Sequence, residues 1–454
     1  MPKFHFIAVG GSAMHNLALT LADKGYRITG SDDVIYEPSY SRLKKAGILP
    51  EKFGWFPEKI TPDLDGIIVG MHAKPDNPEL KKALELGLPV YSYPEFLYRE
   101  AANKKRVVIA GSHGKTTTTA ALIHVLDKNG IHPDFMVGSL LEGFDRMVRI
   151  TGSADTFIFE GDEYPTSPLD PRPKFLHYKP HIAVITGIAL DHINVFKTWE
   201  DYIRQFELFI DTIEPGGTLI YFEEDDNLKK LAGKRSDIRY IPYGTPDYEV
   251  KDKRFFLIDR KTGEEIPLKI FGKHNMQNLE AVRLLAQETG IDDTRFYDAV
   301  KDFSGASLRL QKLVDSDSWT LIRDFAHAAS KVRASVAAVR ELYPDRKLLA
   351  VQELHTYSSL NKDYLPEYAH ALDPADEAVI FYDPEALRIK NREPIEPDFI
   401  RRAYKREDLK IFTDAESFKN FLYDKEKQGS VWLLMSSGNL GGLDIEKLIS
   451  GYGH

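Results

Sequence analysis

Cysteine is absent from the sequence. Disulfide bonds, thiolate metal sites and thioester-forming cysteine nucleophiles are therefore excluded. The sequence also lacks an excess of positive charge, because 60 lysines and arginines stand against 69 aspartates and glutamates, for a formal net charge of -9. A nucleic-acid-binding surface needs clustered basic residues, so we expect no nucleic-acid partner.

Long apolar runs are missing as well. The longest stop well short of the roughly 18 residues that cross a bilayer, and the chain starts directly with the strand-like KFHFIAVG instead of a charged and then apolar leader. We therefore expect a cytoplasmic protein that does not insert into a membrane. Its 43% hydrophobic and 28% charged residues are typical of a soluble globular protein.

Short apolar segments bounded by turn residues recur along the chain, and most of them precede a helical pattern. This alternation predicts βαβ units and parallel sheets, and hence an α/β fold. The clearest of these segments read FHFIAV, DGIIVGM, RVVIAG, TFIFEGD, HIAVITGI, TLIRDF, KLLAVQEL and VWLLMSS.

Two breaks divide the chain, whose 454 residues are too many for one ordinary core. The basic, helix-ending YREAANKKR precedes the strand RVVIAG, and the small-residue segment FSGASLRL precedes a strand-rich final third. We predict domains at residues 1–102, 103–304 and 305–454. Inside the second domain, FFLID and IPLKIF flank the turn RKTGEE and predict a β-hairpin.

The segment RVVIAGSHGKTTTTAA predicts a strand, a glycine turn and a helix that together hold a phosphate. Gly111 and Gly114 allow backbone N–H groups to converge on phosphate oxygens, Lys115 can meet the β- and γ-phosphates, and Thr116 offers a hydroxyl to Mg²⁺. The usual pattern G-x-x-x-x-G-K-[ST] is broken, because Ile109 occupies the place of its first glycine. A glycine turn with a chance lysine is the alternative, but four successive threonines are poor helix formers and favour a phosphate contact.

Polar residues follow two later strands and are candidates for holding a metal. FIFEGDEY ends with Glu160, Asp162 and Glu163, and ITGIALDHINVF carries Asp191 and His192. Mg²⁺ prefers oxygen ligands such as carboxylates, and we expect the ends of these strands on the same rim of the sheet. Surface carboxylates and a structural histidine are the alternatives at these positions.

The first predicted strand leads into another glycine turn, in HFIAVGGSAM. Gly10, Gly11 and Ser12 follow this strand, and Ser31 and Asp32 follow the next one. The arrangement predicts a dinucleotide-like crevice. It also suits NAD with Asp32 on a ribose, so an NAD-dependent oxidoreductase is one alternative function.

The phosphate loop resembles that of the Mur ligases, the ATP-dependent amide-forming enzymes of peptidoglycan synthesis. Their loop reads G-T-x-G-K-T, and GSHGKT fits it with Ser112 in place of threonine. The resemblance covers the whole chain and implies ATP and Mg²⁺ as cofactors, with three domains that are Rossmann-like, P-loop ATPase and Rossmann-like in order. The ATP-binding positions that it implies in the loop are Gly111, Ser112, His113, Gly114, Lys115, Thr116 and Thr117.

Two segments resemble the metal-binding motifs of the Mur ligases. EGDEY resembles E-A-D-E-x-D, which implies Glu160 as a Mg²⁺ ligand beside Thr116. DHINVF resembles the family's D-H segment, which implies His192 as the ligand of a second Mg²⁺. We therefore expect Lys115, Glu160 and His192 to be catalytic.

Three later segments resemble ATP-side motifs of the family, with some departures. FGKHNMQNLEAV resembles the H-N-x-x-N helix start beside the adenine, SLRL keeps one of the family's two arginines, and RDFAHAAS resembles D-D-Y-A-H-H-P-T. The matching residues are Asn275, Asn278, Arg309, Asp324 and His327. The residues that depart from the family are Leu308, Arg323, Ala328 and Ala329. These departures motivate a further alternative, a catalytically inactive regulatory protein that binds a UDP-sugar and ATP.

The first glycine turn resembles the G-I-G-G-x-G-M turn that receives a UDP diphosphate, with Ala8 and Ala13 where glycines are common. Gln205, in YIRQFELF, matches the position of a metal-bridging carbamylated lysine in other Mur ligases, and glutamine there is typical of the branch that acts on UDP-N-acetylmuramate. The resemblance therefore implies UDP-N-acetylmuramate as a substrate. The UDP-sugar-binding residues that it implies are Gly10, Gly11, Ser12, Ser31 and Asp32.

Within that branch, four segments resemble those of enzymes that attach the tripeptide L-Ala-γ-D-Glu-meso-diaminopimelate in peptidoglycan recycling. They are GSDDVIYEPSYSRLKKAGI, GMHAKPDNPEL, EGDEYPTSPLDPRPKFLHYKP and LLMSSGNLGGLD. LHTYSS instead resembles the P-H-R-Y-S-R of enzymes that add L-alanine, which is the alternative amine. Either amine would attack an acyl phosphate formed from the substrate carboxylate and ATP. We expect a monomer or weak homodimer whose partners are these small molecules.

Overall fold

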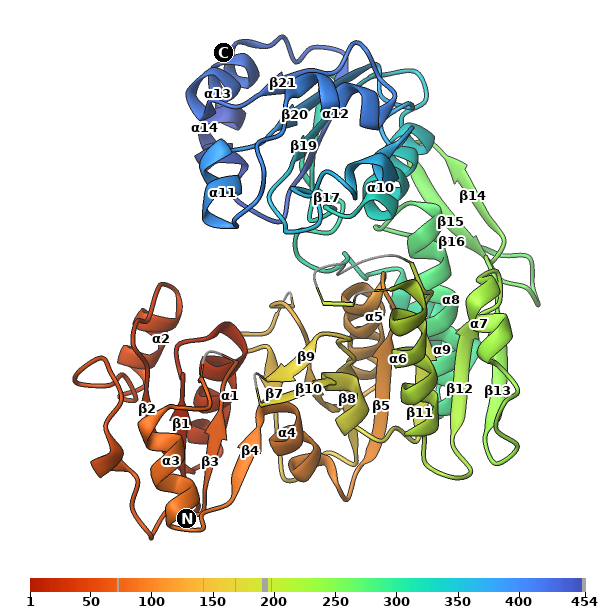
Figure 1. The fold of residues 1–454 in the computed structure, drawn as a ribbon. Helices are drawn as coiled ribbons and strands as arrows, with labels where there is room; N and C mark the ends of the chain where they lie inside the picture. Colours follow the sequence, from red (N-terminus) through yellow and green to blue (C-terminus); the bar gives the residue numbers. More distant parts are fainter. Residues whose placement is uncertain (72, 142, 168, 190–194, 197, 451–454) are drawn as a thin grey trace. The chain divides into compact units, whose positions relative to one another are not determined.

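The computed structural model describes residues 1–71, 73–141, 143–167, 169–189, 195, 196 and 198–450. The chain forms two compact units. One consists of Met1–Ile188, Thr198–Tyr243 and Ala281–Asp293, and the other of Ala189–Lys197, Gly244–Glu280 and Thr294–His454. Each contains parallel β-sheet with flanking helices (Figure 1). None of the described helices is long and apolar enough to cross a membrane.

The first sheet of the first unit has four parallel strands in the order β2-β1-β3-β4. Phe4, Phe6 and Ile7 are fully buried, as expected for the strand that lies between two parallel neighbours. The strands are β1 (Lys3–Ile7), β2 (Arg27–Ser31), β3 (Gly66–Val69) and β4 (Val90–Ser92). The helices are α1 (Ser12–Asp23), α2 (Ser39–Lys45), η1 (Pro57–Lys59), α3 (Pro78–Glu85) and α4 (Tyr93–Ala101).

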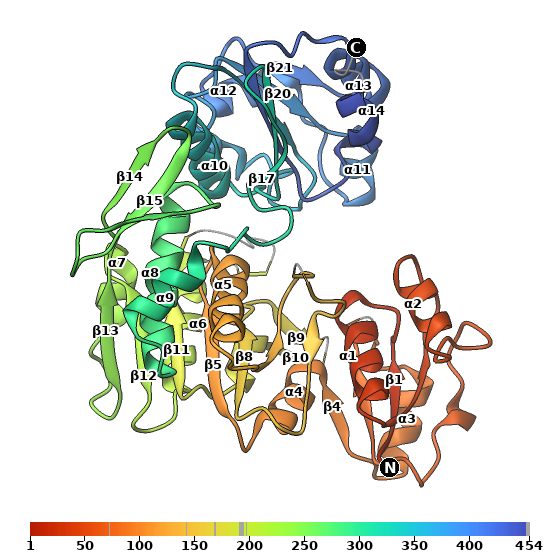
Figure 2. The same cartoon turned by 180° about the vertical axis from the view of Figure 1, so that it is seen from behind.

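The second sheet of this unit has seven strands in the order β13-β12-β11-β5-β8-β6-β7, and β7 alone among them runs antiparallel to its neighbour. β5 lies between β11 and β8 in both views (Figure 1, Figure 2). The strands are β5 (Lys105–Ala110), β6 (Asp134–Met136), β7 (Val148–Arg149), β8 (Thr156–Glu160), β11 (Ile182–Ile185), β12 (Thr218–Phe222) and β13 (Arg239–Tyr243).

Helices and one hairpin complete this part of the chain. β9 and β10 pair with each other as a separate antiparallel ribbon. Helices α8 and α9 each have residues in both units. The bounds are β9 (Pro165–Ser167), β10 (Asp170–Pro173), α5 (Lys115–Lys128), η2 (Lys174–His177), α6 (Trp199–Asp211), α7 (Asp226–Leu231), α8 (Lys273–Glu288) and α9 (Asp293–Val300).

The second unit begins with an antiparallel sheet of three strands, β14 (Tyr248–Lys251), β15 (Arg254–Ile258) and β16 (Glu265–Pro267). The hairpin predicted from FFLID and IPLKIF is confirmed, because β15 and β16 pair across the expected turn. β14 pairs with β15 in addition to the predicted hairpin, and its segment YEVK is too short and polar to predict a strand.

The main sheet of the second unit has six strands in the order β17-β18-β22-β19-β20-β21, all parallel except β17. In both views α10 and α12 lie on one side of it, and α13 and α14 lie on the other (Figure 1, Figure 2). The strands are β17 (Gln311–Asp315), β18 (Trp319–Asp324), β19 (Lys347–Glu353), β20 (Glu377–Phe381), β21 (Lys410–Phe412) and β22 (Ser430–Met435). The helices are α10 (Ala329–Leu342), η3 (Leu365–Tyr368), α11 (Pro384–Ile389), α12 (Pro397–Tyr404), α13 (Ala415–Asp424), η4 (Leu440–Gly442) and α14 (Ile445–Ser450).

The predicted α/β class is confirmed, and parallel sheets with flanking helices recur in three parts of the chain, at β1–β4, at β5–β13 and at β17–β22. Apolar runs such as VVIA and VWLLM became buried parallel strands, because a parallel sheet covered on both faces has no polar side. The boundaries at residues 102 and 304 remain a prediction.

We expect Leu434→Ala to destabilise the second unit. Leu434 lies on β22, a central strand, and is fully buried against Trp319, Trp432 and Val351, so truncation leaves a cavity. The free energy of unfolding should fall by about 2–5 kcal/mol, measured by urea titration with tryptophan fluorescence. Ile389→Ala, at a side chain that is 69% exposed, should change it by less than about 0.5 kcal/mol. Equal effects of the two substitutions would contradict this assignment of the core.

Candidate active site at the phosphate loop

The predicted phosphate loop connects β5 to α5. β5 ends at Ala110 and α5 begins at Lys115, so the glycine turn lies at the carboxyl edge of the sheet and at a helix N-terminus, where anions bind readily. Gly111 has φ 128° and Gly114 has φ 75°. A Cβ at Gly111 would lie 2.9 Å from the backbone nitrogen of Thr186. The turn therefore requires glycine at position 111 for both its conformation and its space.

Lys115 is held inside the loop by hydrogen bonds. Its Nζ donates to the carbonyl oxygen of Gly111 at 2.6 Å and to Glu163 Oε2 at 2.7 Å. Burial lowers the pKa of Lys115, but the charges of Glu163, Asp162 and Glu160 outweigh burial, so that its pKa is raised from the ordinary value. Lys115 is therefore a charged ammonium group on the first residue of α5, and a positive charge there suits phosphate binding.

Thr116 and Glu160 bring two kinds of oxygen together. Thr116 Oγ1 donates to Glu160 Oε1 at 2.7 Å, and the backbone nitrogen of Gly138 donates to Glu160 Oε2 at the same distance. Both residues are buried, and each exposes 8% of its surface. A threonine hydroxyl and a carboxylate are ligands of the type that Mg²⁺ prefers, so these two residues fit a magnesium ion.

The other predicted loop residues lie around this cluster. Ser112 and Thr117 are buried, and the carbonyl oxygen of His113 accepts from Thr186 Oγ1. Of the threonine run, Thr119 bonds to a carbonyl group of its own helix. His192, predicted as a metal ligand, and the adjacent Asp191 lie outside the described residues.

Glu163 and Tyr202 are the residues whose roles sequence reasoning missed. Glu163 appeared only as one of three carboxylates after a strand, whereas the structure places it on Lys115. Asp162 instead bonds to Lys174 at 2.7 Å. Tyr202 of α6 donates to Glu163 Oε1 at 3.1 Å. The sequence had no signal for this contact, because Tyr202 and Glu163 are 39 positions apart.

The predicted adenine-side residues lie in the second unit. Asn275 Nδ2 donates to the carbonyl oxygen of Phe271 at 2.8 Å, and Asn278 Nδ2 donates to Asn275 Oδ1 at 3.3 Å. Both amides thus donate hydrogen bonds at the start of α8.

Arg309, Asp324 and His327 come together around Phe325. The Arg309 guanidinium lies 4.7 Å from the centre of the Phe325 ring, and His327 Nδ1 lies 2.9 Å from the Phe325 carbonyl oxygen. Asp324 Oδ1 accepts from the Phe325 backbone nitrogen at 2.9 Å. Leu308, where the family has a second arginine, takes a left-handed φ of 57°. Strained backbone of this kind is common at functional sites.

The five predicted UDP-sugar residues also lie together, at the carboxyl edge of the four-stranded sheet. Asp32 Oδ2 accepts from the backbone nitrogen of Gly10 at 2.7 Å, so this N–H group is already bonded. Ser31 is fully buried, and its Oγ accepts from Lys59 Nζ at 3.2 Å. Ala8, where the family commonly has glycine, has a left-handed φ of 67°. The turn thus keeps a glycine-like conformation without the glycine.

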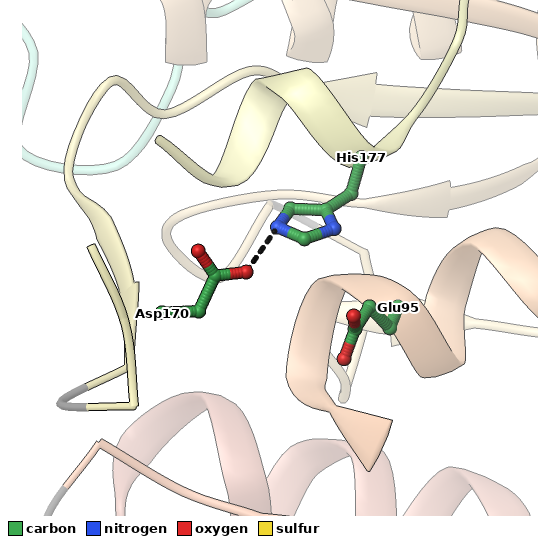
Figure 3. Close-up of side chains that lie close together, drawn as sticks. All are labelled: Glu95, Asp170 and His177. Carbon is green, nitrogen blue, oxygen red and sulfur yellow. Dashed lines mark ion pairs between the residues drawn. The ribbon is translucent and has the colours of Figure 1, made fainter. Parts of the chain in front are cut away.

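A second group of potential metal ligands lies elsewhere in the first unit. Glu95 of α4, Asp170 of β10 and His177 of η2 each offer one atom within 4.8 Å of the others, and Figure 3 shows the contact of His177 with Asp170. Asp170 also pairs with Arg172 at 2.7 Å, and Glu95 caps α4 by accepting from Ser92. Each carboxylate therefore has a protein partner, and we assign the group a structural role.

Known proteins resemble this chain over two thirds or more of its length. The "UDP-N-acetylmuramate--L-alanine ligase" of Carboxydothermus hydrogenoformans is 30% identical over 97% of this chain and 95% of its own. The crystal structure of the UDP-N-acetylmuramate-alanine ligase from Thermotoga maritima has a TM-score of 0.71 at 21% identity, with 100% of this chain and 98% of that one covered. The UDP-N-acetylmuramate:L-alanyl-gamma-D-glutamyl-meso-diaminopimelate ligase from Neisseria meningitides has a TM-score of 0.59 at 27% identity, with 67% of this chain and 98% of that one covered.

Family models match the two parts that carry the glycine turns. Residues 3–105 match the model described as Mur ligase family, catalytic domain, and residues 109–286 match the Mur ligase middle domain. The second match includes the loop, Lys115, Thr116 and Glu160. With a relative 30% identical over nearly its whole length, the chain belongs to the Mur ligase family of ATP-dependent amide-forming enzymes.

Proposed function

We propose that this ligase joins the carboxylate of UDP-N-acetylmuramate to the amino group of a peptide, with cleavage of ATP. The observation that carries the proposal is the cluster at the N-terminus of α5, where Lys115 pairs with Glu163 and Thr116 bonds to Glu160. A relative named for L-alanine and a relative named for the tripeptide both have UDP-N-acetylmuramate in their names, which supports this substrate.

The cluster suits phosphoryl transfer. Attack of the substrate carboxylate on the γ-phosphate of ATP forms an acyl phosphate and releases ADP, and catalysis then consists mainly of positioning and charge neutralisation. Lys115 supplies a positive charge, and the first N–H groups of α5 supply further donors. The amine then attacks the acyl carbon, phosphate leaves, and an amide bond remains.

Mg²⁺ fits beside the loop. Thr116 Oγ1 and the Glu160 carboxylate would hold it, and the resemblance adds His192 for a second ion. A bound Mg²⁺ would neutralise negative charge on the phosphates. Thr116 Oγ1 bonds to Glu160, which keeps both oxygens facing each other at the end of β8.

We assign the remaining ATP contacts from the resemblance. Asn275 and Asn278 would meet the adenine, and Arg309, Asp324 and His327 would bind the nucleotide as well. The grouping of the last three around Phe325 supports a shared role. The catalytically inactive alternative is not favoured, because Lys115, Thr116 and Glu160 are intact and Thr116 bonds to Glu160.

The UDP diphosphate would lie at the turn of Gly10, Gly11 and Ser12, beside Ser31. Asp32 shapes this turn through its bond to Gly10. Burial, followed by the neighbouring Asp33, raises the pKa of Asp32 to about 6, although the N–H bond from Gly10 acts in the opposite direction. Asp32 thus contributes to the turn rather than reaching for a ribose, which favours a UDP-sugar over NAD.

For the amine we propose the tripeptide L-Ala-γ-D-Glu-meso-diaminopimelate. The alanine-adding enzymes have two arginines in P-H-R-Y-S-R, and this chain has Thr356 and Ser359 in their places. Thr356 Oγ1 donates to Ser359 Oγ at 2.9 Å, so two neutral hydroxyl groups bond to each other where two cations would stand. L-alanine is the second candidate, because the curated relative that matches 97% of the chain is named for it.

The expected site of action follows from the substrates. ATP and UDP-sugars are cytoplasmic nucleotides, so we infer that the enzyme acts in the cytoplasm. A monomer or weak homodimer remains our expectation for its oligomeric state.

We expect phosphate release from ATP and Mg²⁺ to require both UDP-N-acetylmuramate and the tripeptide. Lys115→Ala should lower kcat/KM for ATP by about 10²–10³-fold, because one donor to the transferred phosphoryl group is lost. Lys229→Ala is a matched control at an exposed lysine of α7 and should leave the rate unchanged. Turnover with L-alanine but not with the tripeptide would identify L-alanine as the amine substrate. No Lys115-dependent release with either amine would contradict the proposed reaction.

Asp32 should make the stability of the protein depend on pH. Its folded-state pKa of about 6 lies above the ordinary value of 3.8, so the folded state holds a proton that the unfolded chain has lost, and stability falls as pH rises from about 4 to about 6. Asp32→Asn removes this decrease in stability, because an asparagine side chain does not titrate. The free energy of unfolding of the variant relative to the wild type should therefore increase by at most about 3 kcal/mol between pH 4.5 and 6.5 and then stay constant. If the free energies of unfolding of the wild type and of Asp32→Asn, measured by urea titration, change in parallel with pH, Asp32 does not titrate in this range.

A further inference from the structure

Tyr202 is a buried tyrosine that reaches the phosphate loop from a distant part of the sequence. It lies in the first turn of α6 and is fully buried. Its ring packs against Trp199 and, edge to face, against Phe206, with centroid distances of 5.7 and 5.3 Å. These contacts hold the ring firmly, so that its hydroxyl group has a defined position.

The Tyr202 hydroxyl connects the phosphate loop with Glu163. It lies 2.7 Å from Ser112 Oγ and donates to Glu163 Oε1 at 3.1 Å. A carboxylate that pairs with Lys115 accepts hydrogen bonds, so the single phenol proton goes to Glu163 and Ser112 donates to the Tyr202 oxygen. Lys115 binds the other oxygen of the same carboxylate at 2.7 Å. The loop is thus tied to Glu163 twice, through Lys115 directly and through Ser112 and Tyr202.

Gln205 does not take part in this connection. It matches the position where other Mur ligases carry a carbamylated lysine, but its Nε2 donates to the backbone oxygen of Asp201 in its own helix at 2.9 Å. Tyr202, almost one turn earlier in α6, is the side chain of that helix that bonds to the loop. The two residues therefore have different surroundings, so the role of the carbamylated lysine in other Mur ligases does not extend to Tyr202.

We propose that Tyr202 is a positioning residue that holds Glu163 in place when Lys115 leaves it for a phosphate of ATP. The inference rests on the proposed role of Lys115. The Glu163 side chain is fully buried, and a buried carboxylate that loses a donor carries a large desolvation cost. A phosphate that attracts Lys115 removes one donor from Glu163, and the Tyr202 hydroxyl remains on its other oxygen. The cost of transferring Lys115 from Glu163 to ATP is lower for that reason.

The test is Tyr202→Phe in the full-length protein. The variant keeps the packed ring and loses the hydroxyl group, so we expect the Kd for MgATP, measured by titration calorimetry, to rise about tenfold. Bound ATP has already drawn Lys115 away, so kcat should change by less than about threefold while KM for ATP rises with Kd. Tyr178→Phe is the matched control, because Tyr178 is equally buried in the same unit and its hydroxyl has no hydrogen-bond partner among the described residues. It should leave Kd unchanged.

A second variant separates positioning from a structural role. Glu163→Gln removes the charge that needs the Tyr202 donor, so adding Tyr202→Phe to Glu163→Gln should change the Kd for MgATP by less than about twofold. A tenfold effect in both backgrounds, or a lower melting temperature with Kd unchanged, would overturn the inference. Wild-type Kd for MgATP in Lys115→Ala would instead overturn the proposed role of Lys115. Weak binding by Lys115→Ala together with wild-type binding by Tyr202→Phe would overturn only the role of Tyr202.

Discussion

The buried ion pair between Lys115 and Glu163 is the interaction on which the rest of the candidate site depends. A charge in a protein interior is stable only when it is paired and hydrogen-bonded, and this pair also meets the carbonyl oxygen of Gly111 and the Tyr202 hydroxyl. The arrangement holds a lysine at a helix N-terminus through protein partners. A phosphate can replace Glu163 as the partner of Lys115 because both are anions.

The parallel sheet explains why these residues meet. β5 has β8 as one neighbour and β11 as the other, and the carboxyl ends of parallel strands share one edge of the sheet, where α/β proteins bind their ligands. The first turn of α5, which follows β5, supplies Lys115 and Thr116, and the end of β8 and the residues after it supply Glu160 and Glu163. Most of the sheet is therefore a frame that brings short polar segments to one place.

Much of this could be predicted from the sequence. The continuous apolar runs identified the parallel strands, and GSHGKT identified the phosphate loop and its helix, because both signals are local. The contacts of Glu163 and Tyr202 could not be predicted, since Glu163 is 48 positions from Lys115 and Tyr202 is 90 positions from Ser112. Glycine-like backbone at Ala8 and Leu308 was equally hidden, because tertiary contacts impose that conformation on residues that do not favour it.

The curated relative that matches 97% of the chain is named for L-alanine, whereas four segments of the sequence resemble enzymes that attach the tripeptide. The relatives share UDP-N-acetylmuramate in their names and differ in the amine. The chain keeps the loop, Lys115 and Glu160, and departs from the alanine-adding enzymes at Thr356 and Ser359, which follow β19 in the second unit. Our proposal, a shared reaction with a different amine, accounts for both observations.

The most direct test of the site is a crystal structure of the full chain with Mn²⁺ and a non-hydrolysable ATP analogue. Anomalous scattering locates Mn²⁺ in place of Mg²⁺. We predict a manganese ion within about 2.5 Å of Thr116 Oγ1 and of a Glu160 oxygen, and Lys115 Nζ bonded to a phosphate instead of Glu163. Phosphates away from residues 111–116, with Lys115 still paired to Glu163, would contradict the account.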